Sequence, residues 1–515
     1  MSKQLRNALL PLLLTSHLAN SASLGQLLNQ AQQEFPVIYL PSVGIIGESS
    51  KSFTLADGEG VGIEVNGYRF SGNDSLSNST LEAALKPFSQ RTLTPKQIYS
   101  LTSFIRQLYR EYDIVATAEV PPQDVEGGII DIQITESRFA GVELDYGFED
   151  SFNVSLERIE TTAQNGISSD QPLKVSELER GQLLAIDLHG VAVSGGHHPD
   201  GSGGEVLELW IENTPKFSGT LDFKNRTDSN EKIQAVLTSL YSSPFNRGGA
   251  LYINGIKEEQ LNFASLAYRG PIGYDGATFD IQAGALQSDR SSSGSRAYSY
   301  SAGYRYPLVR SVAHNLFLTT QAERRDLGYH LDSLTLSLDG NRALNWGRLT
   351  YSTAVTLGEN DSLNSSSSGE FKLASGFLNY NQRTESGWRT NARLSGQLTS
   401  TPLDDSERLI VGGPNALRGY TAADGLADQG LLLRLDLRKN VSQKLTLGVL
   451  YDRGELHYRK GDKTSLSLSN LGAEIGYSLE SDIRLKVSAA KALNDSTGYT
   501  QQGDWQLYAR FSIPF

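Results

Sequence analysis

From residue 217 to residue 515, apolar and polar residues alternate along the chain. In LLLRLDLR at 431–438, the leucines at odd positions lie on one face of an extended chain, and the charged residues lie on the other. The same alternation recurs in DIRLKVSAA at 482–490 and in QLYARFSIPF at 506–515. A period of two is typical of half-buried β-strands, whereas a helix needs a period of 3.6. This region therefore predicts an all-β domain.

The alternating pattern predicts sixteen strands. The windows lie near 217–226, 233–242, 249–258, 261–270, 277–288, 297–306, 315–325, 333–342, 347–358, 371–382, 387–399, 429–438, 444–455, 470–479, 482–491 and 505–515. An even count is typical of single-chain bacterial membrane barrels. The four longest gaps, near 359–370, 400–428, 456–469 and 492–504, all follow odd-numbered strands, which predicts extracellular loops there. The very short gap after the third strand is an exception to this pattern.

A basic start and a short apolar run open the chain. Lys3 and Arg6 precede ALLPLLLTSHLA at 8–19, and the small residues NSAS follow at 20–23. This order predicts a cleavable secretory signal over residues 1–22. A membrane anchor is disfavoured, because twelve residues are too few to cross about 30 Å of hydrocarbon. We therefore expect the mature chain in an extracytoplasmic space.

Alternation alone does not separate a water-soluble sandwich from a transmembrane barrel. Three observations favour the barrel over residues 217–515: the export signal, the many charges on the polar face, and the last residue, which lies inside an alternating strand. We take Phe511, Ile513 and Phe515 as the C-terminal signal of such a barrel. Only a closed barrel lets strands cross hydrocarbon without unpaired backbone groups.

Residues 61–212 follow a different pattern, in which strands and helices alternate. LTPKQIYSLTSFIRQLYREY at 93–112 predicts a helix, with Thr94 as N-cap, Pro95 at the first position and Gln97 completing a capping box. Strands are expected near 61–72, 114–120 and 128–134, and a short helix near 78–88. A weaker copy follows, with helices near 154–162 and 175–187. We expect two small α+β domains, at 61–138 and 139–216.

Residues 23–60 join the signal to the first domain. SLGQLLNQAQQE at 23–34 places Leu24, Leu27 and Leu28 at helical spacing, and the proline- and glycine-containing stretch after it predicts a linker. On pattern alone, the segment is a short frayed helix.

Composition excludes several classes of protein. The net charge of −12 argues against a general nucleic-acid binder, and a mean hydropathy of −0.33 against a bundle of membrane helices. The chain has no cysteine, which excludes disulfides and thiolate metal sites. A glycine-rich turn contains His197, His198 and Asp200 with no third distant ligand, so we expect no metal there. We also expect no cofactor and no catalytic site.

One loop carries a candidate site. VGGPNALRGY at 411–420 lies in the longest connection, between the eleventh and twelfth strands. If this loop folds into the lumen, its arginine needs a partner, because an unpaired buried charge is costly. Strand parity aims Asp452 at the lumen, and Gly454 leaves room beside it. We expect a bidentate pair between Arg418 and Asp452 in a wet lumen, with Glu474 as the alternative partner.

These residues resemble the outer-membrane transporters of two-partner secretion, the TpsB proteins of the ShlB/FhaC/HecB type. The loop residues Leu417, Arg418, Gly419 and Tyr420 are similar to the superfamily's lumen loop motif, and LYDRG at 450–454 is similar to its strand motif. VPPQDVEGGIIDIQITESR at 120–138 and LERGQLLAIDLHGVAV at 178–193 resemble the ends of POTRA domains. The resemblance implies a sixteen-stranded barrel after two POTRA domains, and places at 23–34 the family's helix that plugs the pore.

The resemblance also implies a function. A member of this family secretes one large β-helical partner, such as an adhesin, a cytolysin or a contact-dependent toxin, without nucleotide hydrolysis. The partner would dock on a POTRA strand edge, for which the candidate residues are Ile114, Val115, Ala116, Thr117, Ala118, Glu119 and Val120. Further expected partners are outer-membrane lipid and, during biogenesis, the barrel-assembly machinery; nucleic acid is not expected, and the transporter is expected to be a monomer. A barrel-assembly factor of the same superfamily and a passive solute channel are the alternatives.

Overall fold

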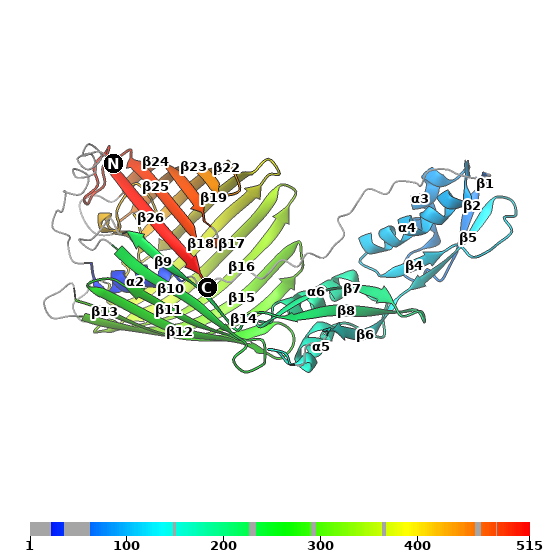
Figure 1. Cartoon of the computed structure of the whole chain (residues 1–515), viewed down its shortest axis with the longest axis horizontal. Coiled ribbons are helices and arrows are strands. Elements are labelled where there is room, and N and C mark those ends of the chain that lie inside the picture. Colours follow the sequence, from blue (N-terminus) through cyan, green and yellow to red (C-terminus); the bar gives the residue numbers. More distant parts are fainter. Residues whose placement is uncertain are drawn as a thin grey trace.

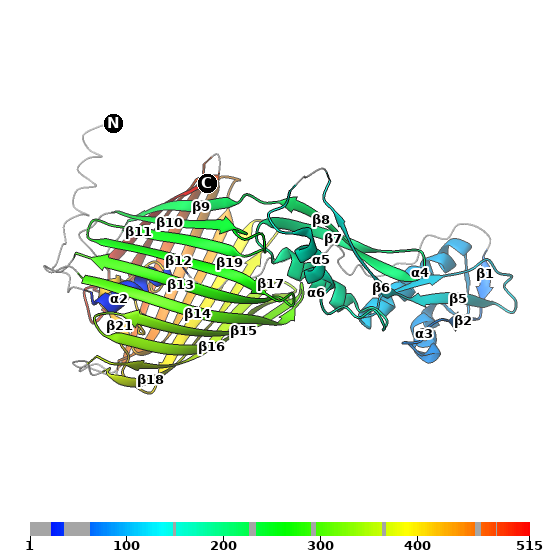
Figure 2. The same cartoon turned by 90° about the horizontal axis from the view of Figure 1, so that it is seen from below.

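The computed structural model describes residues 22–35, 62–147, 151–225, 233–289, 295–362, 367–458, 465–479 and 482–515. The expected secretory signal lies outside these residues except for its last position, and so does the expected linker from residue 36 onward. The described parts form three bodies in a row: a large barrel, the small α+β domain of residues 138–213 against one end of it, and the small domain of residues 62–136 beyond that (Figures 1 and 2).

The barrel is closed and contains sixteen antiparallel strands, which confirms the predicted count. Its strands are β9 (Phe217–Asn225), β10 (Ile233–Ser242), β11 (Ala250–Lys257), β12 (Leu261–Ile272), β13 (Ala277–Ser288), β14 (Ser295–Arg310), β15 (His314–Asp326), β16 (His330–Leu344), β17 (Gly347–Asn360), β18 (Gly369–Arg383), β19 (Trp388–Thr399), β22 (Gln429–Asn440), β23 (Leu445–His457), β24 (Ser465–Ser478), β25 (Arg484–Ala492) and β26 (Trp505–Pro514). The last strand, β26, pairs with the first, β9, and closes the cylinder.

The pleat of each strand separates an outer apolar face from a polar lumen. On β23, Leu447 and Val449 point outward and are 42% and 55% exposed, whereas Asp452 points inward and is fully buried. Outward leucines and valines on a closed barrel are the residues that meet lipid. The two faces of the alternating pattern therefore meet different surroundings, lipid outside and the lumen inside.

Each small domain packs two helices on a three-stranded sheet. The first sheet has the order β2-β5-β4 and the second β6-β8-β7. The first domain contains β1 (Ile63–Val65), β2 (Gly67–Ser71), α3 (Asn78–Leu85), η2 (Lys86–Phe88), β3 (Arg91–Leu93), α4 (Pro95–Glu111), β4 (Ala116–Glu119) and β5 (Ile129–Glu136). The second contains β6 (Arg138–Asp145), α5 (Leu156–Gln164), α6 (Val175–Ile186), β7 (Val191–Pro199) and β8 (Gly204–Asn213).

Local signals in the first domain were partly correct. The capping box at the start of α4 is present, with Thr94 and Gln97 bonded reciprocally. The single strand expected near 61–72 is instead two strands, because the backbone N–H of Asn66 donates to the carbonyl of Gly128 at 2.7 Å between them. Strand β3 was not predicted, since three residues are too few to show a period.

The second small domain fixes which end of the barrel is which. The turn after β14 contacts α6: Arg310 donates to Asp187 at 2.8 and 2.9 Å, and the N–H of Val312 donates to Glu179. Connections that follow even-numbered barrel strands therefore lie on the side of the small domains. Among the described residues, no helix combines the length and the apolar character needed to cross a bilayer.

Candidate functional site

The connection after β19 folds back into the barrel and has its own small structure. It contains β20 (Leu409–Ile410), the short helix η3 (Ala422–Asp424) and β21 (Leu426–Ala427), and β20 pairs with β21. Leu417 and Tyr420 are fully buried and pack against inward side chains of the barrel wall. The hydroxyl of Tyr420 donates to the carbonyls of Ser469 and Asn494, at 2.9 and 3.1 Å.

Arg418 lies at the centre of this loop and contacts two carboxylates. Its Nε and Nη2 donate to Asp452 at 2.9 and 2.5 Å, and its backbone N–H donates to the same carboxylate at 2.9 Å. Its Nη1 donates to Asp436 on β22. One guanidinium thus spans two neighbouring strands and orients the loop against both.

The surroundings of this pair differ from the expectation of a wet lumen. The side chain of Arg418 is 5% exposed and that of Asp452 is 0% exposed. Leu417, next to Arg418 in the chain, and Tyr420 are fully buried in the same apolar cluster of the loop and the wall. The interaction therefore belongs with buried ion pairs, whose disruption is far more costly than that of surface pairs.

Two glycines let the loop come this close to the wall. A Cβ on Gly454 would lie 2.8 Å from Leu417, so this glycine makes room for Leu417 rather than for Asp452 as expected. A Cβ on Gly419 would lie 2.4 Å from the side chain of Asn470. One added carbon atom at either glycine would therefore clash with the facing segment, so the loop motif and the strand motif pack directly against each other.

Sequence reasoning missed two partners in this cluster. Asp436 faces the lumen by the same parity as Asp452, but its position next to Arg418 depends on the register of two strands that no local pattern fixes. Asn470 donates to Asp452 at 2.9 Å. The alternative partner, Glu474, is instead bonded to Arg438 at 2.8 Å and to Lys486 at 2.7 Å.

A second buried carboxylate ties the loop to the last extracellular connection. Asp424 accepts hydrogen bonds from Thr421 within the loop, and from Ser496, Tyr499 and Thr500 in the connection between β25 and β26. A carboxylate that accepts several backbone N–H bonds fixes the two segments relative to each other.

The segment expected as a frayed helix or a plug forms helix α2 (Leu24–Gln33) inside the barrel (Figure 1). Leu27, Leu28 and Ala31 are buried against inward apolar residues of the strands, which include Val236, Ile256, Leu261, Phe263, Leu286 and Ala297. The helix also contacts the loop, because Gln26 donates to the carbonyl of Ala422 and Asn29 to that of Arg408, at 3.2 and 3.0 Å. Helix and loop together occupy the lumen.

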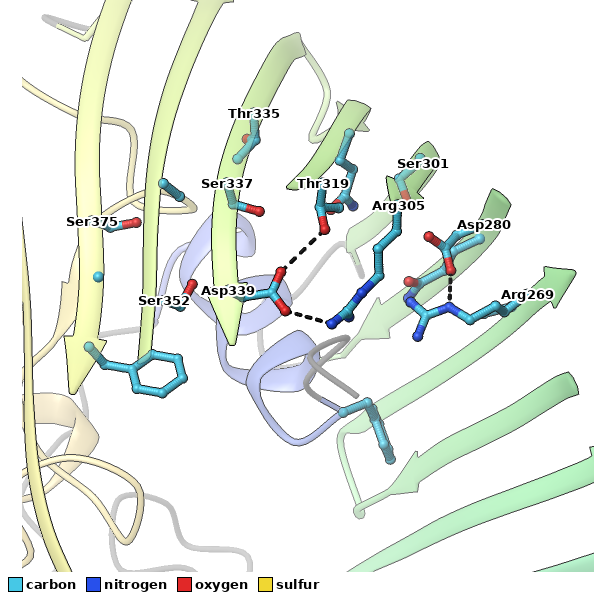
Figure 3. A pocket seen from close by; sticks show the side chains of 18 of the residues that line it. Arg269, Asp280, Ser301, Arg305, Thr319, Thr335, Ser337, Asp339, Ser352 and Ser375 are labelled. Atoms are coloured by element: carbon cyan, nitrogen blue, oxygen red, sulfur yellow. Dashed lines mark hydrogen bonds and ion pairs between the residues drawn. The ribbon is translucent and has the colours of Figure 1, made fainter. Parts of the chain in front are cut away.

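Between α2 and the small domains, the lumen holds a cavity of about 540 Å³. Its wall carries two ion pairs: Arg269 of β12 with Asp280 of the neighbouring β13, and Arg305 of β14 with Asp339 of β16, which also accepts from Thr319 of the intervening β15 (Figure 3). Serine and threonine side chains line much of the remaining wall. The surface of this cavity thus combines charged and hydroxyl groups with apolar side chains such as Phe35 and Phe377.

The other sequence-predicted residues lie apart from the lumen cluster. Ala116–Glu119 form β4, an edge of the first sheet, whereas Ile114 and Val115 pair with residues 173–174 of the second domain. Phe511 and Ile513 lie on β26 opposite Phe223 and Leu221 of β9, and the Phe515 ring lies 5.5 Å from that of Phe217. His197 contacts Glu205 and Arg110, and so lies between the two small domains.

Comparison with known proteins agrees with this architecture. Residues 63–137 match the model of the ShlB-type POTRA domain, and residues 327–479 match that of the haemolysin secretion/activation protein ShlB/FhaC/HecB. The second match covers both the loop and Asp452. These two domains are those of a two-partner secretion transporter of the ShlB/FhaC/HecB type. The transporter lies in the outer membrane, with its POTRA domains in the periplasm.

Individual relatives extend the likeness to most of the transporter. It is 25% identical over 468 residues to the heme/hemopexin transporter protein HuxB of Haemophilus influenzae, which covers 82% of each chain. Its fold is similar to that of CdiB from Escherichia coli, with a TM-score of 0.67 at 18% identity over 95% of this chain and 97% of the other. CdiB from Acinetobacter baumannii gives a TM-score of 0.63 at 15% identity, with the same coverage.

Proposed function

We propose that the transporter exports one large β-helical protein, an adhesin, a cytolysin or a contact-dependent toxin, from the periplasm to the cell surface. Transporters of this family work with large secreted partner proteins. One observation carries the proposal for this chain: the lumen is filled by α2 and the loop after β19, neither of which is a strand of the barrel wall. Both can move without opening the cylinder.

The partner would dock first on the POTRA domains. Strand β4 is an edge of its sheet, and an extended peptide can add to such an edge through main-chain hydrogen bonds. We limit the candidate edge to Ala116–Glu119, because Ile114 and Val115 already pair with the second domain. The partner would then pass into the lumen as an extended chain, and its folding outside the cell would drive export without catalysis or nucleotide hydrolysis.

The decisive experiment deletes the protein and examines the cell surface. One large exported protein should disappear from the surface and return when the wild-type chain is restored. The levels of other outer-membrane barrels should not change. A general loss of barrels would instead support the barrel-assembly alternative. An unchanged surface with altered uptake of small solutes would support the passive channel.

A further inference from the structure

The lumen wall formed by β18, β19 and β22 carries arginines that differ from those on β12 to β16. On β12 to β16, inward arginines are matched with carboxylates, as in the pairs of Arg269 with Asp280 and Arg305 with Asp339 (Figure 3). On this wall, the arginines outnumber the available carboxylates. We call the following set the arginine wall: Arg383, Arg389, Arg393, Arg434 and Arg438.

Strand register places these arginines directly opposite one another. Arg383 faces Arg389 across β18 and β19, and Arg389 faces Arg438 across β19 and β22. Four residues deeper, Arg393 faces Arg434. Adjacent strands are only about 4.8 Å apart, and like charges in opposing positions destabilise a sheet. The arrangement therefore has a cost in the resting structure.

Counter-charges within the described part of the chain do not neutralise the wall. Arg383, Arg389 and Arg393 make no ion pair with any described residue; Arg393 lies over the Phe377 ring, 4.0 Å from its centroid. Arg438 contacts Glu474, which also binds Lys486, and lies 3.6 Å from Asp436, which already binds Arg418. Arg434 is 3.9 Å from Asp452, a carboxylate that already binds Arg418. An excess of positive charge therefore remains on this wall.

The arginine wall begins at the periplasmic mouth of the barrel. Arg383 ends β18 and Arg389 lies at the start of β19, on either side of a turn that follows an even-numbered strand. Such turns lie on the side of the second small domain. Arg393 lines the 540 Å³ cavity farther inside. A chain that enters from the periplasm would therefore meet the first row of arginines and then the second.

We propose that the arginine wall binds carboxylate side chains of an extended, acidic segment of the exported polypeptide at the entrance of the lumen. This inference rests on the proposed export function. Arg389 and Arg393 are four residues apart, or about 13 Å along the strand. An extended chain beside β19 presents same-face side chains about every 7 Å, so carboxylates at positions i and i+4 match the two rows. Guanidinium groups bind carboxylates through two parallel hydrogen bonds, which suits this contact.

The test measures binding of a peptide probe to the full-length protein in detergent. The probe is a fluorescent glycine-serine peptide with glutamate at every fourth position, and the comparison peptide carries glutamine at those positions. Fluorescence anisotropy should show binding of the glutamate peptide only. The triple variant Arg383→Gln, Arg389→Gln, Arg393→Gln should weaken this binding about tenfold or more, because it removes the charge-assisted hydrogen bonds.

A matched variant controls for net charge. Arg91→Gln, Arg106→Gln, Arg138→Gln removes the same charge from exposed positions of the small domains and should bind the glutamate peptide as the wild type does. Arg393→Lys, which keeps the charge, should retain most of the affinity. Heat-dependent mobility in gels verifies that each variant has a folded barrel.

Several results would overturn the inference. Equal affinity for the two peptides, or an unchanged affinity in the triple variant, would show that the arginine wall does not bind carboxylates. Binding that appears only after Glu48, Asp57 and Glu59 are changed to glutamine would assign the wall to this chain's own residues 36–61. If the protein exports its partner but does not bind the glutamate peptide, the inference about the arginine wall is wrong and the proposed function still stands. Peptide binding without any lost surface protein in the deletion strain refutes the proposed function and, with it, the identity of the occupant.

Discussion

At the scale of single residues, Arg418 joins the loop to the barrel wall. The arginine shares its guanidinium between Asp452 and Asp436, and all three side chains are nearly excluded from solvent. Breaking a buried ion pair from one side costs roughly 3–5 kcal/mol, because the remaining charge stays buried. Here the lost free energy destabilises the inward-folded position of the loop and not the barrel, because the sixteen paired strands hold the barrel closed without this ion pair.

We therefore expect Arg418→Ala to leave the barrel inserted and heat-resistant but to release the loop and reduce export. Protease sensitivity of residues 400–428 in intact cells measures the release, and surface display of the partner measures export. Arg418→Lys should rescue only partly, because an ammonium cannot contact Asp436 and both oxygens of Asp452 at once. Asp452→Ala should be more damaging than Asp436→Ala, since Asp452 also accepts from the backbone of Arg418 and from Asn470. Normal export by Asp452→Ala would show that the pair does not hold the loop.

A second residue-scale prediction concerns pH. His189 of the second small domain lies against the barrel, where its backbone N–H donates to the carbonyl of Gly248 and its ring packs on Tyr252. Burial, helped by the charge of Arg269, lowers the pKa of His189 to about 4. A free histidine has a pKa near 6.5. The contact is therefore fully stable above about pH 6.5 and loses up to about 3 kcal/mol as the pH falls toward 4.

We expect amide hydrogen exchange in residues 243–252 to accelerate at pH 5 relative to a His189→Gln variant measured at the same pH. The comparison with this variant cancels the intrinsic effect of pH on exchange. At pH 7.5 the two proteins should differ little. Parallel exchange curves at both pH values would show that protonation of His189 does not loosen the domain from the barrel.

At the scale of elements, local patterns predicted most of the barrel. Each of the sixteen windows lies within a few residues of a strand, because a period of two is a property of the strand itself. The short β20 and β21 escaped prediction, since two residues cannot show alternation. The register between strands, which brings Asp436 to Arg418 and Arg389 to Arg438, depends on the closed cylinder and leaves no local signal.

The barrel residues that contact α2 carried a sequence signal that the sequence analysis did not use: apolar residues on the lumen face. On β12, Leu261 and Phe263 face the lumen although the rest of that face is more polar, and Ile256 of β11 lies opposite Phe263. Apolar residues on a lumen face are stable only when another segment buries them, and the leucines of α2 bury these residues. The helix pattern alone could not place the segment, because nothing within residues 23–34 says what it packs against.

The element-scale prediction tests whether α2 obstructs the pore. Gly25 approaches the loop so closely that a Cβ there would lie 3.0 Å from the backbone nitrogen of Ser406. Gly25→Val should therefore displace the helix, and deletion of residues 24–33 should remove it; both should raise single-channel conductance in planar bilayers, the deletion more. Gln33→Val adds the same side chain at an exposed position and should conduct as the wild type does. Wild-type conductance in the deletion variant would show that α2 does not limit the pore.

At the scale of the whole molecule, the second small domain and the barrel meet through an ion pair and apolar contacts. The side chain of Arg310, at the end of β14, is 0% exposed. It donates to both oxygens of Asp187 at 2.8 and 2.9 Å, and to Asn315 at 2.9 Å. Glycines complete the contact, because a Cβ on Gly276 would lie 2.4 Å from Leu184, and one on Gly248 would lie 2.6 Å from Leu188. These contacts hold the second small domain at a fixed angle to the pore mouth.

We expect Arg310→Ala to loosen this angle without unfolding either body, because the ion pair lies between two separately formed hydrophobic cores. Removing one partner of a buried, bidentate pair costs roughly 3–5 kcal/mol. The spread of distances between spin labels on α5 and on the turn after β16 should broaden, and export should fall while barrel insertion stays normal. Arg324→Ala, which breaks an exposed pair with Asp332 at the far end of the barrel, is the matched control and should change neither quantity. A wild-type distance distribution in Arg310→Ala would mean that the apolar contacts around Gly276 and Gly248 alone hold the domain in place.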